Sequence, residues 1–365
     1  MNLAGPVLIA AGGTGGHLFP AEALGIALQA RGVAVELATD ARAKQYSGAF
    51  PAGTVHQIAA ATPSGGTILV RVKAIATLLA GTFAALRLLR RLRPAAVVGF
   101  GGYPTVAPVL AGSLLRIPTI LHEQNAVIGR ANRFLAGRVD MVATGFPTLK
   151  GIRPGIRTTY TGNPVRPSVV AAAGHPYPED GAFRLLVIGG SQGARIMADI
   201  VPAAVALLPD PARGNLSIAQ QARGEDGARV HKAYSDLSVP AEVLPFFADL
   251  PNRMAAAHLV IGRAGASTVA EVAAIGRPAI LVPFPHALDQ DQAENAEALS
   301  ARGAALVVAQ PEFTPQGLAA ALAAALNDRA SLRRRAALAR SAGVVNGADR
   351  LADLVVGLAR REDRT

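Results

Sequence analysis

The 365-residue chain contains no cysteine and no tryptophan, and aromatic residues make up only 4% of it. The lack of cysteine excludes disulfide frameworks and thiolate catalysis, and it fits a reducing compartment. The scarcity of aromatic side chains argues against a surface that stacks nucleic-acid bases, so we expect no nucleic-acid partner. No basic residue precedes the first apolar run, Val7–Ala11. We therefore predict no signal peptide.

Acidic residues are scarce in the first half of the chain. Residues 1–165 hold 16 Lys and Arg against 5 Asp and Glu, a net charge of +11, whereas residues 166–365 hold 20 of each kind. A basic half favours an anionic partner, either a membrane surface or a phosphate-bearing substrate. The length, with 51% apolar residues, predicts two globular domains rather than one.

The segment Thr67–Arg93 has six basic residues and no acidic one. Its apolar residues fall at helical spacing: Ile75, Leu78, Leu79, Phe83 and Leu86. The uncharged core, Ala74–Leu86, is 13 residues long, and a bilayer span needs about 20. We predict a helix that lies on a membrane surface without crossing it. The alternative is an ordinary packed helix with solvated arginines.

Short apolar strands alternate with helical segments along the whole chain. This alternation predicts an α/β protein with right-handed βαβ units, arranged as two doubly wound parallel-sheet domains. Between these elements, residues 51–66 are predicted as loop and Thr159–Arg166 as linker. An amphipathic terminal helix is expected over Gly347–Arg361.

Three glycine turns follow predicted strands and open helices: residues 12–16 with His17 directly after them, residues 101–103, and residues 189–193. Bare glycines and a helix N-terminus together form a cradle for phosphate. A dinucleotide fingerprint would need a third glycine where Leu18 stands, although Asp40 lies near the position of a ribose acid. We therefore do not favour a nicotinamide cofactor. Tight packing turns are the structural alternative.

A further segment, residues 263–271, reads RAGASTVAE after a predicted strand. Ser267 or Thr268 is expected to cap the next helix and leave its first amides for a diphosphate. Glu271 could accept hydrogen bonds from a ribose diol, or it could serve as a capping-box glutamate with Thr268. Residues 289–291 form a D-x-D pattern, which can bind a divalent cation.

Six ordered motifs carry a resemblance that covers residues 6 to about 358: GGTGGHLFPA, GFGGYPT, HEQN, GNPVR, GGSQGAR and RAGASTVAE. Together they resemble the MurG family of bacterial peptidoglycan glycosyltransferases, in glycosyltransferase family 28. The resemblance implies a GT-B fold and inverting transfer of N-acetylglucosamine from UDP-GlcNAc to the 4-hydroxyl of the lipid I muramyl sugar, giving lipid II. It also implies a peripheral protein on the cytoplasmic face of the inner membrane, with other cell-wall synthesis proteins as further partners.

The resemblance also assigns residues. An acceptor and membrane-associating domain would span 1–163 plus helix 345–365, and a donor-binding domain 164–344. The acceptor diphosphate would contact Gly13, Gly101, Gly102 and Tyr103. The donor would contact Thr14, Gly15, Gly16, Asn125, Arg166, Ser191, Phe247, Ala266, Ser267, Thr268, Glu271 and Gln292. No metal ion or other cofactor is implied, because GT-B enzymes use a helix dipole and amides at the diphosphate. The D-x-D pattern arises where Asp291 replaces the histidine common in the family.

His17 is the candidate general base, because an imidazole titrates near working pH and the residue stands at the mouth of a phosphate cradle. Glu123 is the alternative base, or it could orient an acceptor hydroxyl. A weaker role for His17 is a hydrogen bond to phosphate. Two alternative functions use the same fold: a UDP-GlcNAc 2-epimerase, and a glycosyltransferase with a different lipid acceptor. Neither a dehydrogenase nor a non-enzymatic lipid-diphosphate binder would transfer sugar from UDP-GlcNAc.

Overall fold

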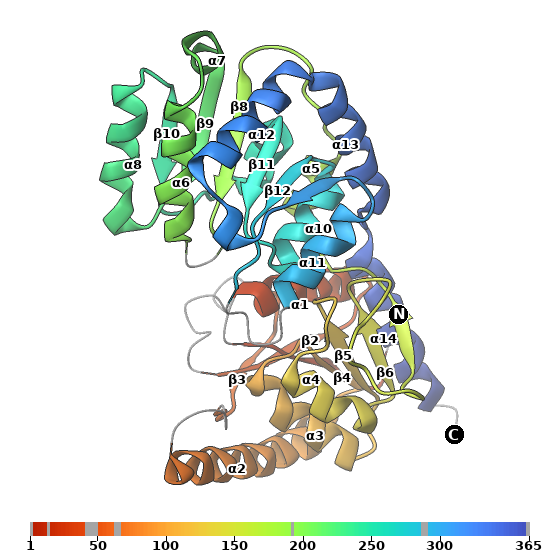
Figure 1. The fold of residues 1–365 in the computed structure, drawn as a ribbon. Helices are drawn as coiled ribbons and strands as arrows, with labels where there is room; N and C mark the ends of the chain where they lie inside the picture. Colours follow the sequence, from red (N-terminus) through yellow and green to blue (C-terminus); the bar gives the residue numbers. More distant parts are fainter. Residues whose placement is uncertain are drawn as a thin grey trace. The chain divides into compact units, whose positions relative to one another are not determined.

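The protein divides into two compact units in the computed structural model (Figure 1). Unit 1 comprises Met1–Arg166 and Asn346–Thr365, and unit 2 comprises Pro167–Val345. The structure describes residues 3–12, 15–40, 50–61, 67–190, 193–285 and 291–362. Five predicted site or motif residues lie outside these ranges: Gly13, Thr14, Ser191, Asp289 and Gln290.

Unit 1 is built on a seven-stranded parallel sheet with the order β3-β2-β1-β4-β5-β6-β7. Its strands are β1 Val7–Ala10, β2 Val35–Thr39, β3 Val55–Gln57, β4 Ala96–Gly99, β5 Thr119–Glu123, β6 Met141–Thr144 and β7 Thr158–Tyr160. Its helices are α1 Gly15–Ala30, α2 Ile68–Leu92, α3 Val106–Leu114, α4 Arg130–Leu135 and α14 Gly347–Glu362, with short 3-10 turns η3 Tyr103–Thr105 and η4 Ala136–Arg138.

Unit 2 has a six-stranded parallel sheet with the order β10-β9-β8-β11-β12-β13. Its strands are β8 Phe183–Ile188, β9 Leu216–Gln221, β10 Ala241–Leu244, β11 Leu259–Gly262, β12 Ala279–Leu281 and β13 Ala305–Val307. Its helices are α5 Pro167–Ala173, α6 Arg195–Ala206, α7 Asp210–Gly214, α8 Gly224–Asp236, α9 Leu250–Ala256, α10 Ala266–Ile275, α11 Asp291–Ser300, α12 Pro315–Asn327 and α13 Arg329–Ala342, with the 3-10 turn η5 Gln310–Glu312.

Both sheets reverse their strand order beside the first strand of the unit, so the predicted doubly wound α/β fold is confirmed. In unit 1 the reversal lies between β1 and β4, which pair in parallel. In unit 2 it lies between β8 and β11. Ligands of open α/β sheets bind at the carboxyl ends of strands at this reversal. The glycine turns after β1, β4 and β8 all leave strands of that kind.

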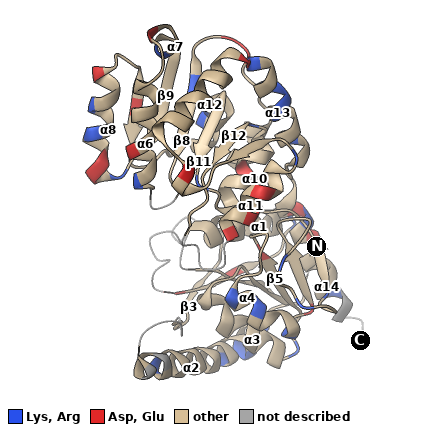
Figure 2. Ribbon diagram, in the orientation of Figure 1, with Lys and Arg blue, Asp and Glu red and all other residues tan. Residues whose placement is uncertain are grey.

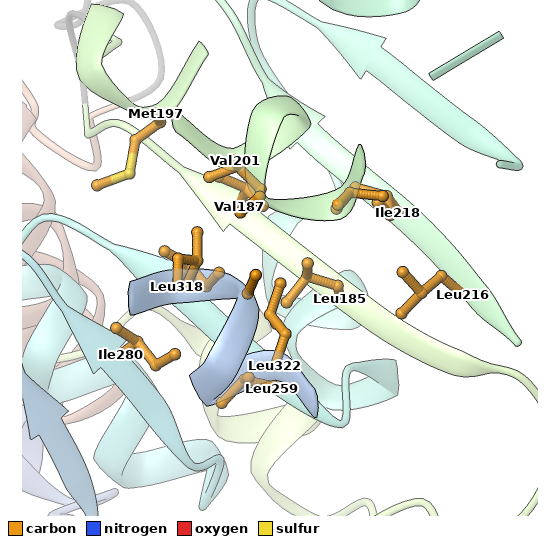
Figure 3. Close-up of a cluster of buried hydrophobic side chains, with 14 of the residues drawn as sticks. Leu185, Val187, Met197, Val201, Leu216, Ile218, Leu259, Ile280, Leu318 and Leu322 are labelled. Carbon is orange, nitrogen blue, oxygen red and sulfur yellow. The ribbon is translucent and has the colours of Figure 1, made fainter. Parts of the chain in front are cut away.

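The central strands are buried on both faces, which is why they read as continuous apolar runs. Along β1, Val7 and Ile9 face a cluster that includes α1 and α14, whereas Leu8 and Ala10 face a cluster formed with α2 and α3. Figure 3 shows the corresponding core of unit 2, where side chains from β8, β9, β11 and β12 meet those of α6 and α12.

Helix α14 completes unit 1 although it lies at the end of the chain. Leu351 and Val355 are fully buried in the cluster that also contains residues of α1. Arg31, directly after α1, donates hydrogen bonds to the carboxylates of Asp349 and Asp353. Apolar burial therefore docks this helix, and ion pairs at its exposed edge fix its position.

Two strands depart from the sequence predictions. β3 falls in the segment predicted as loop, and β7 overlaps the predicted linker. Each is three residues long at an edge of the sheet, and its side chains alternate between exposed and half-buried. Neither contains an apolar run, because pairing with β2 and β6 rather than burial of side chains forms them.

Candidate functional site

His17 lies in the first turn of α1, where it meets the second glycine turn of unit 1. A Cβ atom built on Gly101 would lie 3.5 Å from His17 Nε2, and one built on Gly102 would lie 3.6 Å from His17 Cε1. Both glycines have positive φ angles, of 84° and 74°, which L side chains rarely adopt. The imidazole ring therefore packs against bare backbone, and the structure brings His17, Gly101 and Gly102 together.

Burial lowers the pKa of His17 below its ordinary value, and a hydrogen bond with the Gly12 backbone opposes this shift only in part. The position at the start of a helix acts in the same direction as burial, because the positive end of the helix dipole disfavours an imidazolium. His17 is consequently a neutral imidazole at pH 7. In that state one ring nitrogen donates a proton and the other carries a lone pair.

Glu123 ends β5 and is 2% exposed. Its Oε1 accepts hydrogen bonds from the backbone and side-chain nitrogens of Asn125, at 3.1 and 3.2 Å. Its Oε2 accepts from Gly129 N at 3.0 Å and from Asn132 Nδ2 at 2.8 Å. Burial raises the pKa of Glu123 despite these four donors. The carboxylate thus organises the loop that follows β5 and holds Asn125 in place.

A second polar network, centred on His122, lies next to the loop that follows β5. His122 is fully buried, and its ring stacks on that of Phe100, with the ring centroids 5.4 Å apart. Its Nε2 is hydrogen-bonded to the carbonyl oxygen of Gly162 at 3.1 Å. Burial lowers the pKa of His122 to about 4, so it stays neutral. Asn132 was not a candidate from the sequence, and His122 was noted only as part of the HEQN motif, with no role of its own. The HEQN motif contained the signal for His122, since polar residues that end a buried parallel strand point toward the ligand edge.

The other predicted residues of unit 1 lie around the start of α1 and the end of β4. Gly15 and Gly16 are the first residues of α1, and Tyr103 begins η3 directly after the second glycine turn. The guanidinium of Arg166 lies over the ring of Phe19, 4.5 Å from its centroid. Because Phe19 is two residues beyond His17 on α1, Arg166 adds positive charge near this helix start.

In unit 2, α10 begins at Ala266, and its N-cap is Gly265. The prediction that Ser267 or Thr268 caps this helix is wrong, because both lie inside the first turn. The capping-box alternative for Glu271 fails for the same reason. A glycine cap supplies no side-chain acceptor, so the first amides of α10 point toward any anion placed there. Glu271 is 7% exposed, one turn further along the helix.

Two side chains tether the segment after β12. Gln292, near the start of α11, accepts a hydrogen bond from Phe284 N at 3.0 Å through its Oε1. Arg263, directly after β11, donates to the carbonyl oxygens of Val282 and Pro283 at 3.1 Å. Arg263 stood in a quoted motif but was not predicted as a site residue. Asp291 is the first residue of α11, and the described ranges contain no group of three side chains suited to holding a metal ion.

Phe247 lies between β10 and α9 and is 4% exposed, whereas Phe246 is 66% exposed. The guanidinium of Arg253 lies 4.4 Å from the centroid of the Phe247 ring. Arg253 also donates hydrogen bonds to the carboxylates of Glu242 and Asp249. The buried ring and its arginine therefore anchor this segment and hold its backbone in one conformation.

Helix α2 of unit 1 is confirmed with the bounds Ile68–Leu92, against a predicted 67–93. Ala85, Leu88 and Leu89 pack into the unit. An apolar stripe on the other side, formed by Val72, Ile75, Leu79 and Phe83, is more than half exposed at every position. In Figure 2 the ribbon of α2 is tan over most of its length, with blue toward the end that leads into β4.

By length and composition alone, Val72–Leu92 could cross a membrane, and it is the one such helix in the described ranges. This stretch is longer than the 13-residue uncharged core considered in the sequence. It contains Lys73, Arg87 and other basic residues, and one of its faces is already packed on unit 1.

Comparison with known proteins extends these observations. Residues 7–144 match the N-terminal domain of glycosyltransferase family 28, and residues 184–351 match its C-terminal domain. A relative from Methylobacterium radiotolerans is 56% identical over 361 residues, covering 97% of this chain and 98% of the relative. One from Brucella canis is 54% identical over 363 residues, covering 98% and 96%. Both are named UDP-N-acetylglucosamine--N-acetylmuramyl-(pentapeptide) pyrophosphoryl-undecaprenol N-acetylglucosamine transferase.

Solved structures agree with the fold. The crystal structure of MurG from Acinetobacter baumannii is 31% identical, with a TM-score of 0.80, and the match covers 97% of this chain and 99% of that one. The calicheamicin glycosyltransferase CalG4 is 19% identical with a TM-score of 0.68, over 99% and 100% of the two chains, and supports the fold alone. The predicted GT-B architecture is therefore confirmed, and the chain belongs to glycosyltransferase family 28.

Proposed function

We propose that this chain transfers N-acetylglucosamine from UDP-GlcNAc to the 4-hydroxyl of the muramyl sugar of lipid I, giving lipid II and UDP. The relatives' shared name and the full-length identity support this reaction. The observation that carries the proposal is a neutral imidazole, His17, packed on two bare glycines at the start of α1. A base beside a phosphate cradle is what an enzyme needs when its acceptor carries a diphosphate.

In the proposed reaction the acceptor oxygen attacks the anomeric carbon as the bond to the UDP oxygen breaks, which inverts the configuration. The lone pair of His17 takes the hydroxyl proton. The lowered pKa keeps that lone pair available at neutral pH. The bare backbone of Gly101 and Gly102, with Gly15 and Gly16 at the start of α1, would hold the acceptor diphosphate beside the base.

Unit 2 would hold the donor. The amides that begin α10 after Gly265 face the UDP diphosphate and stabilise its charge as it leaves. Glu271 binds the ribose hydroxyls, the Phe246–Phe247 backbone meets the uracil, and Gln292 meets the sugar. The tether from Gln292 to Phe284 N supports this role because it fixes one end of the side chain.

Glu123 serves as a positioning residue in this proposal. Three of these four hydrogen bonds come from the loop that it organises, two of them from Asn125, and the fourth comes from Asn132 on α4. A carboxylate so engaged would have to break local structure in order to take a proton from a substrate. Its buried, saturated geometry therefore supports His17 as the base and gives Glu123 the task of holding Asn125 toward the substrate.

We also propose that the apolar stripe of α2 rests on an anionic membrane surface, where the acceptor resides. Four apolar side chains at helical spacing, flanked by Lys73 and Arg87, suit insertion to the depth of the headgroups. The packed opposite face supports a surface position rather than a crossing, because lipid cannot surround a helix that is part of a folded core.

The transfer of labelled sugar from UDP-GlcNAc to lipid I tests the reaction directly. For His17→Ala we expect transfer to fall by roughly 10²- to 10⁴-fold while UDP-GlcNAc binding stays within a few-fold. His231→Ala, which removes an exposed histidine on α8, is the matched control. If His17→Ala transfers sugar at a rate within a few-fold of the native rate, His17 is not the general base. A native chain that transfers nothing to lipid I would refute the function.

Membrane contact has its own test, binding to phospholipid vesicles that contain anionic lipid. Leu79→Glu with Phe83→Glu should weaken vesicle binding by at least about 10-fold, because each side chain loses the burial of a large apolar surface. Leu207→Glu is the control, since Leu207 is also a leucine that is more than half exposed, and it lies directly after α6, away from the stripe. If both variants bind the vesicles equally well, the apolar stripe of α2 is not the membrane-binding surface.

A further inference from the structure

Gln221 is the last residue of β9, and it is 9% exposed at the carboxyl edge of the sheet of unit 2. Its amide makes three hydrogen bonds to backbone on two separate segments. Oε1 accepts from Gly189 N at 3.0 Å. Nε2 donates to Gly190 O at 3.1 Å and to Pro245 O at 3.0 Å. One side chain thus joins the glycine turn after β8 to the segment after β10.

The glycine turn depends on this contact for its shape. Gly190 O also accepts from Gly193 N at 3.0 Å, so the carbonyl that closes the turn is the one that Gln221 holds. Only glycine fits at the first position of the turn, because a Cβ atom on Gly189 would lie 2.3 Å from Ala194 N. Gly190, with a φ of 81°, adopts a conformation that favours glycine. Gln221 therefore holds both Gly189 and Gly190 at the start of this turn from a neighbouring strand.

The second segment is the one proposed to meet the uracil. Because the peptide bond is planar and trans, the Phe246 N–H points opposite to the Pro245 carbonyl. Gln221 fixes that carbonyl, so it also fixes the direction in which the next N–H points. Phe247 is then anchored separately by burial and by Arg253.

We infer that Gln221 is a positioning residue that sets the separation between the phosphate-binding turn and the base-binding segment, and so selects uridine diphosphate donors. The inference rests on the proposed function and adds to it that the donor nucleotide also reaches the glycine turn after β8, which the sequence predicts as a phosphate cradle. A ligand with two ends binds best when both contacts are already at the right distance, since ordering them on binding costs affinity. Gln221 does this without touching the ligand.

The neighbouring residue provides a matched control. Gln220 is fully buried on the other face of β9, where it donates to Met197 O at 3.2 Å and accepts from the Tyr234 hydroxyl at 2.5 Å. Gln220→Leu and Gln221→Leu each remove the hydrogen bonds of a buried amide from the same strand. Only Gln221→Leu uncouples the two donor segments. Gln221→Glu keeps the size of the side chain and the acceptor for Gly189 N, but it turns an oxygen toward two carbonyls.

The experiment measures binding of UDP and of ADP, together with the Michaelis constants for UDP-GlcNAc and lipid I. For Gln221→Leu and Gln221→Glu we expect UDP affinity to fall by roughly 10- to 100-fold, while the constant for lipid I stays unchanged. The preference for UDP over ADP should shrink, because the uracil segment is no longer held. Gln220→Leu should keep both the native affinity and the native preference.

Thermal unfolding of all three variants separates positioning from loss of stability. If UDP affinity follows stability, so that Gln220→Leu and Gln221→Leu weaken binding alike, the inference is overturned. An unchanged preference for UDP over ADP in both Gln221 variants overturns it as well. Failure of the native chain to bind UDP would instead refute the proposed function, and is recognised before any variant is compared.

Discussion

His122, the buried neutral histidine near the end of β5, leads to a quantitative prediction of how the stability of the protein depends on pH. His122 is fully buried and has a pKa of about 4, compared with an ordinary value of 6.5. Between these values only the unfolded chain takes up a proton at this position. The free energy of unfolding must therefore fall as pH falls from 6.5 toward 4, and this histidine costs no stability above 6.5.

The size of the effect follows from the pKa difference. Each pH unit in this window removes about 1.4 kcal/mol, which gives about 2 kcal/mol between pH 7 and pH 5 and about 3 kcal/mol in all. His122→Gln removes the titrating group and keeps a donor and an acceptor for Gly162 O and Gln124. As pH falls from 7 to 5, the free energy of unfolding of the native chain should therefore decrease by about 2 kcal/mol more than that of the variant.

Hydrogen exchange measured by mass spectrometry can resolve this in the β5 peptides of unit 1. Other titrating groups, including His17 and Glu123, contribute to both chains and cancel in the difference. Peptides of β8 in unit 2 serve as an internal control and should exchange identically in the two chains. A difference between native chain and variant that stays constant from pH 7 to pH 5 would refute the view that His122 is held neutral by burial.

Other predictions concern single contacts. Gly101→Ala places a methyl group 3.5 Å from His17 Nε2 on a backbone with a φ of 84°, so transfer should slow at least about 10-fold with UDP binding unchanged, as kinetics and calorimetry would show. Leu351→Ala should lower the free energy of unfolding in urea by about 2–5 kcal/mol. Arg31→Ala should lower it by at most about 1 kcal/mol, because its carboxylate partners are 60% and 70% exposed; a larger loss for Arg31 than for Leu351 would contradict the docking described. Asn132→Leu, which removes a donor from buried Glu123, should cost about 2 kcal/mol by the same assay, and no loss would show that the network is dispensable.

The sequence predicted the sheets well because of how they are buried. Central strands such as β1 and β8 are covered on both faces and are apolar throughout, and the glycine turns mark where they end. The edge strands β3 and β7 carry no such pattern, so they could not be seen. Their existence depends on pairing with strands elsewhere in the chain.

Site residues could be predicted from the sequence only where they stand in or next to a recognisable motif. His17 was found because it directly follows a glycine turn, and the structure adds that a second turn meets it. Gln221 gave no signal, because its partners are 24 to 32 residues away and are backbone atoms of any residue type. The cap of α10 was missed because two hydroxyl residues stood beside the glycine that occupies the position.

The return of α14 to unit 1 has a consequence for synthesis of the chain on the ribosome. Leu351 and Val355 belong to the same buried cluster as residues near the amino terminus. In the sequence, unit 2 lies between the two segments of unit 1. It can therefore fold before α14, the last helix of unit 1, has been synthesised. A nascent chain that stops before residue 346 would expose the apolar side chains of α1 that pack on α14, such as Leu24 and Leu28, and this exposed surface is what chaperones and proteases recognise.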